Sequence, residues 1–141
     1  MNSQQRTSIG WINGCWGPTH QLTIPLTDRG LILGDGIFET ILIYNGKVQL
    51  LTQHLERWYK SASILNMAPP PSITWLEPLI DEAIRRNSLT NKNGSLRLNW
   101  SRGDNYQRGI NIPKAKDNER NHRFWLEVNP GEPCFTPIST I

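Results

Sequence analysis

The chain has 141 residues, of which 37% are apolar and 19% are charged, and its formal net charge is +3. This length and composition predict one folded, soluble domain with its own core and exclude an intrinsically disordered chain. No stretch reaches the ~18 apolar residues of a membrane span, the N-terminus lacks a signal-peptide core, and the two cysteines form no CxxC pair. We therefore expect a cytoplasmic protein without a membrane partner, a disulfide framework or a metal site.

The first part of the chain predicts paired strands. Ser8–Ile12 precedes an Asn-Gly turn, and a second strand is expected over His20–Leu26. The clearest hairpin joins Ile37–Tyr44 to Lys47–Leu50, because the Asn-Gly dipeptide between them is the preferred two-residue hairpin loop.

Two helices are expected after this hairpin. In the first, apolar residues recur at spacings of four, three, four and three, which places them on one stripe: Leu51, Leu55, Trp58, Ala62 and Leu65. Thr52 is the expected N-cap, and the prolines at 69–71 prevent continuation. The second helix opens on a capping box, Thr74-x-x-Glu77, and its apolar stripe is Trp75, Leu76, Leu79, Ile80, Ala83 and Ile84.

Two more strands, Ser95–Ser101 and Phe124–Val128, are expected on either side of a polar, irregular segment, Gly103–Arg120. The order of four strands, two helices and two strands predicts an α+β fold, in which a mostly antiparallel sheet carries two helices on one face. Residues 1–128 then form the domain. We expect the proline-punctuated residues 129–141 to be an interdomain linker or the first strand of a further domain.

Gly34-Asp35-Gly36 interrupts the most strand-like apolar run, residues 31–43. It fails the dinucleotide-binding fingerprint, because Glu39 stands where the third glycine is needed. Two interpretations stay open: a turn in which Asp35 caps its own backbone, and a site where the backbone approaches a small ligand. An acid–base pair of Asp35 and Glu39 is disfavoured, because a glutamate on a strand usually faces solvent.

Basic side chains mark two further candidate sites. His54, Arg57 and Ser61 share one face of the first helix, where a guanidinium suits a phosphate or carboxylate clamp; a surface salt bridge is the alternative. Three arginines occupy a predicted strand and the segment after it: Arg97, Arg102 and Arg108. They form either a binding site for an acidic substrate or a solvated basic edge.

Five motifs follow one another along the chain: D-R-G-L-I-L-G-D-G-I-F-E-T at 28–40, the hairpin Y-N-G-K, L-x-x-H-L-x-R at 51–57, S-R-G at 101–103 and R-G at 108–109. This order resembles the class IV aminotransferases, the fold-type IV pyridoxal-phosphate enzymes. Their members include branched-chain and D-amino-acid aminotransferases and 4-amino-4-deoxychorismate lyase. The resemblance covers most of residues 8–128.

The resemblance implies a role for each motif. Arg57 would bind the 5′-phosphate of the cofactor, pyridoxal 5′-phosphate. The residues expected around a small amino-acid-like substrate are Gly34, Asp35, Gly36, Phe38, Arg97, Arg102 and Arg108. The resemblance also implies a homodimer.

The S-R-G and R-G motifs resemble 4-amino-4-deoxychorismate lyase, which forms 4-aminobenzoate and pyruvate for folate synthesis. The D-amino-acid enzymes carry a histidine soon after their arginine-glycine, and no histidine lies between Arg102 and Arg120 here. A branched-chain or D-amino-acid aminotransferase of the same fold is the alternative.

The chain departs from the family in its lysines. The family requires a lysine that forms a Schiff base with the cofactor, in a setting that keeps its amine neutral. The lysines of this chain lie in predicted turns, on a polar helix face or in the polar segment: Lys47, Lys60, Lys92, Lys114 and Lys116. We therefore expect an N-terminal domain that is inactive without a C-terminal domain carrying the lysine.

A non-enzymatic, basic nucleic-acid-binding module is the competing hypothesis. Its support is the positive net charge and the six tryptophans. Against it, the basic residues form no block, and Trp58 and Trp75 lie on predicted core stripes rather than on a stacking platform. Nucleic acid is therefore not an expected partner.

Overall fold

The computed structural model describes residues 7–104 and 121–132 of the chain. In these residues a six-stranded antiparallel sheet has the strand order β2-β1-β6-β5-β3-β4. The strands are β1 (Ile9–Ile12), β2 (Cys15–Pro18), β3 (Gly36–Tyr44), β4 (Lys47–Val48), β5 (Gly94–Ser101) and β6 (Arg123–Pro130). The helices are α1 (Arg29–Leu33), α2 (Leu51–Ile64) and α3 (Ile73–Arg86), with a 3-10 helix, η1, at Thr19–Gln21.

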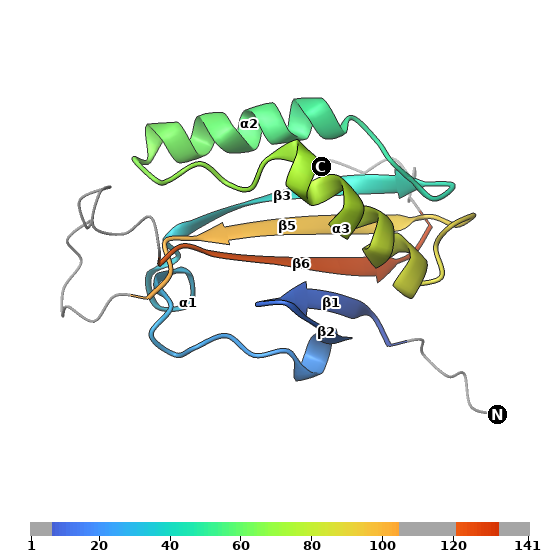
Figure 1. Ribbon diagram of the computed structural model, residues 1–141, viewed down its shortest axis with the longest axis horizontal. Coiled ribbons are helices and arrows are strands. Elements are labelled where there is room, and N and C mark those ends of the chain that lie inside the picture. Colours follow the sequence, from blue (N-terminus) through green and yellow to red (C-terminus); the bar gives the residue numbers. More distant parts are fainter. Residues whose placement is uncertain (1–6, 105–120, 133–141) are drawn as a thin grey trace, which may run out of the picture.

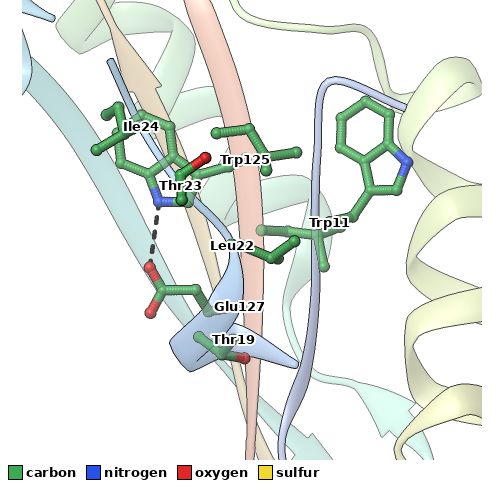
Figure 2. Close-up of a pocket in the computed structure, with 9 residues that line it drawn as sticks. Trp11, Thr19, Leu22, Thr23, Ile24, Trp125 and Glu127 are labelled. Carbon is green, nitrogen blue, oxygen red and sulfur yellow. Dashed lines mark hydrogen bonds between the residues drawn. The ribbon is translucent and has the colours of Figure 1, made fainter. Parts of the chain in front are cut away.

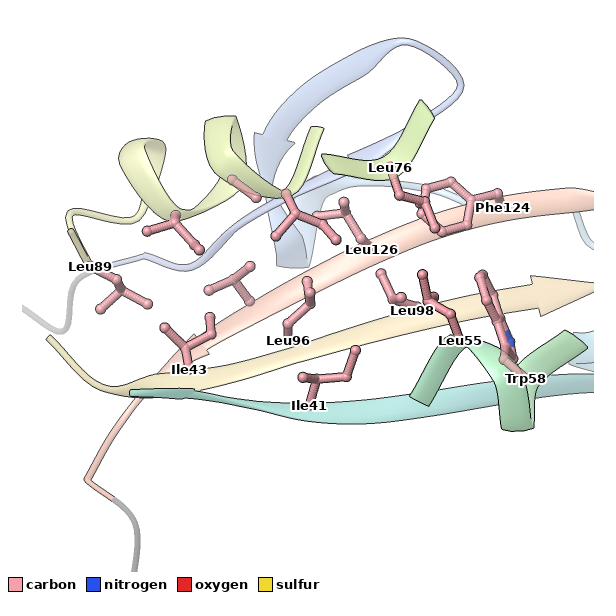
Figure 3. Close-up of a cluster of buried hydrophobic side chains, with 14 residues drawn as sticks. Ile41, Ile43, Leu55, Trp58, Leu76, Leu89, Leu96, Leu98, Phe124 and Leu126 are labelled. Carbon is pink, nitrogen blue, oxygen red and sulfur yellow. The ribbon is translucent and has the colours of Figure 1, made fainter. Parts of the chain in front are cut away.

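Helices α2 and α3 both lie over one face of the sheet (Figure 1), which confirms the predicted α+β fold. Alternate side chains of the long strands point toward these helices. Figure 3 shows the resulting core, whose buried members include Ile41, Ile43, Leu55, Trp58, Leu76, Leu96, Leu98 and Leu126. Burial of each such side chain stabilises the fold by about 1.5–3 kcal/mol, so this face of the sheet holds the helices in place.

That other face, which we call the open face, carries the side chains that alternate with the core. The strand register places Phe38 of β3, Asn99 of β5 and Trp125 of β6 side by side across it. Neither α2 nor α3 covers this face, and the segment between η1 and α1 crosses one part of it (Figure 1). The candidate site is therefore sought here and along the edge of β3.

The predicted second strand, His20–Leu26, is wrong. β2 begins directly after the Asn-Gly turn, and Cys15–Pro18 pairs with Ile9–Ile12. The turn residues adopt the positive φ angles of a two-residue hairpin loop, so the partner strand starts at once. Pro18 then ends the strand, and the chain turns through η1. The other hairpin, around Asn45-Gly46, is confirmed.

Both predicted helix caps are wrong, although both helices are confirmed. Helix α2 begins after Leu50, which has a positive φ of 56° and no side-chain cap, rather than at Thr52. Helix α3 is capped by Ser72, whose Oγ accepts a hydrogen bond from the backbone N–H of Trp75 at 3.3 Å. Thr74 therefore lies inside the helix, where it cannot act as the cap.

Two smaller findings concern the limits of the domain. β6 runs to Pro130, two residues beyond the predicted boundary at residue 128. Over residues 7–104 and 121–132, no helix is long and apolar enough to cross a bilayer.

Candidate functional site

The Gly34-Asp35-Gly36 segment follows a one-turn helix rather than interrupting a strand. Asp28 caps this helix, α1, because its Oδ1 accepts hydrogen bonds from the backbone N–H groups of Gly30 at 2.8 Å and Leu31 at 3.3 Å. Gly34 ends it with a left-handed φ of 64°, and β3 then starts at Gly36. The apolar side chains of α1 that suggested a strand are exposed.

Contacts with distant parts of the chain hold α1 in place. The buried Asp28 carboxylate also accepts hydrogen bonds from Ser101 Oγ at 2.7 Å and from the Arg123 guanidinium. Arg123 in turn binds Asp104, and this hydrogen bond holds the pKa of the Asp104 carboxyl below its ordinary value. The last residue of β5 and the first residue of β6 therefore hold α1 in place. No local sequence pattern predicts these contacts.

Asp35 does not cap its own backbone. Its Oδ2 accepts hydrogen bonds from Arg29 Nε at 2.7 Å and from Arg102 Nε at 2.8 Å. Arg102 is buried, and its remaining nitrogens donate to the carbonyl oxygens of Leu65 and Asn66 at the end of α2. Asp35 and Arg102 are thus engaged with one another and do not line the open face.

Four of the predicted substrate residues do meet in one depression of about 390 Å³ on the open face: Gly34, Gly36, Phe38 and Arg97. The Arg97 guanidinium lies 3.9 Å from the centre of the Phe38 ring, and its Nε donates to Asn99 Oδ1 at 3.0 Å. These contacts fix a positive charge against an apolar ring. Arg108 lies outside the described residues.

A side chain at position 36 would be crowded by the backbone of β5. A Cβ added to Gly36 would lie 3.0 Å from the carbonyl oxygen of Trp100. Gly34 and Gly36 bring backbone without side chains to the lining of the depression, which is what the second of the two open interpretations of this segment expects.

Glu39 is buried, contrary to the expectation that it faces solvent. Its side chain is 4% exposed and lies on the core side of β3, in step with Ile37, Ile41 and Ile43. Its carboxylate accepts hydrogen bonds from His54 Nδ1 at 2.9 Å, Arg57 Nε at 2.7 Å and Arg57 Nη2 at 2.5 Å. A buried carboxylate requires such partners, and α2 supplies them from one helix face.

The electrostatics of this cluster keep both partners charged. Burial alone raises the pKa of the Glu39 carboxyl, but the hydrogen bonds from Arg57 and His54 outweigh it, so the net pKa lies below the ordinary 4.5. The hydrogen bond to Glu39 in turn raises the pKa of Arg57. Arg57 nevertheless stays 69% exposed. The arrangement is a guanidinium that is oriented from behind and open in front.

The strand β3 connects the two clusters. Phe38 and Glu39 are consecutive, so they point to opposite sides of the sheet. β4 pairs only with Ile43 and Tyr44, so the edge of β3 from Gly36 to Ile41 has no partner strand among the described residues. The two clusters are therefore joined by adjacent residues of one edge strand.

A comparison of sequences decides the family. A sequence model described as amino-transferase class IV matches residues 36–135. The chain belongs to the class IV aminotransferase family. This confirms the resemblance seen in the motifs.

Curated relatives agree with membership in the class IV aminotransferases. The D-alanine aminotransferase of Listeria innocua serovar 6a is 29% identical over 116 residues, which cover 74% of this chain and 39% of that protein. The D-alanine aminotransferase of Staphylococcus haemolyticus is 31% identical over 93 residues, covering 66% of this chain and 32% of that protein. The chain therefore spans well under half the length of these relatives.

Solved class IV aminotransferases share the fold. The branched-chain amino acid aminotransferase of Escherichia coli superposes with a TM-score of 0.72 at 22% identity, covering 89% of this chain and 40% of that chain. A hypothetical aminotransferase from Mycobacterium tuberculosis in its PLP-bound form gives a TM-score of 0.68 at 24% identity, covering 86% and 39%. At this identity the likeness establishes the fold.

Replacing Glu39 by glutamine should make stability less dependent on pH in the acid range. Because the folded-state pKa of Glu39 is lowered, its carboxylate stabilises the class IV fold above about pH 4.5, and this contribution is lost as the pH falls through the folded-state value. Urea unfolding between about pH 7 and about pH 3 measures the effect. The difference between wild type and Glu39→Gln should shrink on acidification.

Glu82→Gln is the matched control for this prediction. Like Glu39, Glu82 has two basic partners, Arg85 and Arg86, but they lie on the surface of α3, where an ion pair contributes little. A stability difference for Glu39→Gln that stays constant across the pH range, or that equals the one for Glu82→Gln, would show that the ionised Glu39 carboxylate does not stabilise the fold.

Proposed function

We propose that this chain supplies the phosphate-binding and substrate-facing part of a pyridoxal-phosphate-dependent aminotransferase. The observation that carries the proposal is Arg57, an exposed guanidinium held in one orientation by the buried Glu39. The printed names of the relatives, D-alanine and branched-chain amino acid aminotransferases, support amino transfer as the reaction. Membership in this family favours an enzyme over a nucleic-acid-binding module.

The free edge of Arg57 fits a phosphate group. A guanidinium carries five N–H donors. Glu39 accepts from Nε and once from Nη2, which leaves Nη1 and the second N–H of Nη2 without a partner in the described part of the chain. These groups form the outer edge of the fork, the edge that binds a phosphate with two parallel hydrogen bonds. Glu39 removes most of the rotamer freedom that binding would otherwise cost.

The chain's other residues would handle the substrate. Bound pyridoxal 5′-phosphate acts as an electron sink for bonds to the α-carbon of an amino acid. Arg97, fixed by Asn99 and the Phe38 ring, offers its remaining N–H groups to a substrate carboxylate. The Phe38 ring adds apolar surface at the same place. Both residues project from rigid strands, which suits precise orientation.

The activity of the whole protein is part of this proposal, because the chain spans only 39% of the first relative. It requires a lysine that a further domain contributes, and the homodimer implied by the resemblance belongs to the same proposal. The lyase subtype remains the second candidate. Its main support was the S-R-G motif, but the Arg102 of that motif is engaged with Asp35.

The test uses the protein produced from its complete gene, with pyridoxal 5′-phosphate added. Amino transfer from D-alanine, L-leucine or L-glutamate to a 2-oxo acid is measured beside pyruvate release from aminodeoxychorismate. We expect amino transfer with at least one donor and no pyruvate release. Pyruvate release alone would replace the aminotransferase by the lyase. A protein that binds no cofactor and shows neither activity would overturn the proposal.

A further inference from the structure

A second, smaller hollow lies on the open face beside the depression. It has a volume of about 130 Å³, and its apolar lining includes Ile12 of β1. Figure 2 shows two further apolar lining residues, Leu22 and Ile24. We call it the annex. Trp125 and Ile24 line both the annex and the depression. These two residues thus form a wall that the annex and the depression share.

Trp125 is held in this position by its neighbours. Its indole Nε1–H donates to Glu127 Oε1 at 3.1 Å, as Figure 2 shows. Its backbone carbonyl accepts from Asn99 Nδ2 at 3.3 Å. The register places Trp125 between Ile12 on one side and Asn99 on the other. The ring therefore stands between the annex, on the β1 side, and the depression, on the β5 side.

The chemistry of the annex favours an uncharged, apolar occupant. Among the described residues, the one ionisable group that lines it is Glu127, and a carboxylate there repels a second acid. Its size is close to that of an engineered apolar cavity of about 150 Å³ in another protein that binds benzene. Arg97, the one charged group lining the depression in the described residues, lies on the far side of the wall. A ligand spanning both would have an acidic head and an apolar tail.

We propose that the annex receives the apolar end of the substrate and that Trp125 is a specificity-determining residue. The proposal rests on the proposed function only in taking the depression as the substrate's place. It implies an amino acid or oxo acid whose side chain is aliphatic or aromatic and reaches past Trp125. Alanine would leave the annex unused.

The test uses the cofactor-free, 141-residue chain labelled with 5-fluorotryptophan and three probes: 4-phenylbutyrate, butyrate and benzene. Trp125→Phe assigns the Trp125 resonance in the fluorine NMR spectrum. We expect 4-phenylbutyrate to bind at least about tenfold more tightly than butyrate, because its phenyl group is buried. 4-Phenylbutyrate and benzene should both shift the Trp125 resonance.

Leu22→Phe should fill the annex and bring the affinity for 4-phenylbutyrate down to that for butyrate. Leu26→Phe is its matched control, because Leu26 lies on the same segment, lines neither hollow and is 83% exposed. Equal binding of the two acids by wild type, or unchanged discrimination in Leu22→Phe, would overturn the proposal, as would a Trp125 resonance that no probe moves. These readouts need no cofactor, so failure of the aminotransferase assignment would be seen separately, as absent cofactor binding.

Discussion

Replacing Arg102 by methionine should lower the free energy of unfolding by about 3 kcal/mol. The Arg102 side chain is 2% exposed and serves three acceptors: Asp35 Oδ2 at 2.8 Å, Leu65 O at 2.7 Å and Asn66 O at 3.2 Å. Methionine retains length and apolar character but donates nothing. The two carbonyl groups at the end of α2 would lose the donors that Arg102 supplies, and the Asp35 carboxylate would keep only Arg29.

Urea unfolding followed by tryptophan fluorescence measures this loss, with Arg97→Met as the control. Arg97 lies on β5, the strand that ends just before Arg102, but its side chain is exposed on the open face, so its replacement should cost less than about 1 kcal/mol. Equal losses in the two variants would show that the Asp35–Arg102 pair does not stabilise the fold.

The position of Arg102 also bears on function. It joins the end of α2 to Asp35, the residue between the two glycines. Gly34 and Gly36 line the depression, whereas Asp35 faces the arginines. The Asp35 carboxylate thus holds in place the backbone of the two glycines that line the depression. Arg102, which the sequence predicts as a substrate-binding residue, thus holds the backbone beside the depression.

The elements whose sequence pattern is local were predictable. Helices α2 and α3 follow from the 3.6-residue spacing of their apolar residues, and the hairpin follows from Asn45-Gly46, because each signal is local. The order of motifs was also sufficient to indicate the family, since it needed no geometry. Four of the predicted substrate residues, Gly34, Gly36, Phe38 and Arg97, share one depression because β3 and the turn before it lie beside β5.

The parts that failed depend on residues far apart in the sequence. The helix α1 is stabilised through Asp28 by Ser101 and Arg123, 73 and 95 residues away. The burial of Glu39 had a local signal, because the alternation of Ile37, Ile41 and Ile43 places it on the apolar face. That signal was outweighed by the usual exposure of glutamate, and only the fold shows that α2 presents Arg57 opposite it.

Trp125 and Ile24 were missed for a different reason. Trp125 alternates with the core residues Phe124 and Leu126 and so belongs to the open face, but a side chain on an open face is usually only solvent-exposed. Ile24 was placed in a strand that the chain does not form. Its role follows from the path of the segment between η1 and α1, which no periodicity specifies.

Replacing Arg57 by methionine should weaken the binding of pyridoxal 5′-phosphate by about 10–100-fold in the protein produced from its complete gene. The variant loses the outer edge of the guanidinium, whose charged hydrogen bonds to a phosphate are worth about 1.5–3 kcal/mol. Isothermal titration calorimetry measures the loss. Pyridoxal, which lacks the phosphate, should bind wild type and variant equally, so the effect is specific to that group.

Arg85→Met is the matched control, because Arg85 is also an exposed helical arginine whose Nε and Nη2 bind one glutamate, Glu82. Its side chain is 67% exposed against 69% for Arg57, so both variants remove the same charge from similar surroundings. Arg57→Met leaves the buried Glu39 with His54 alone, and the double variant Glu39→Gln/Arg57→Met removes that imbalance. If Arg57 binds the phosphate directly, the double variant loses as much affinity as the single one. Equal losses for Arg57→Met and Arg85→Met, or a loss of the same size for pyridoxal, would mean that Arg57 only forms a surface ion pair.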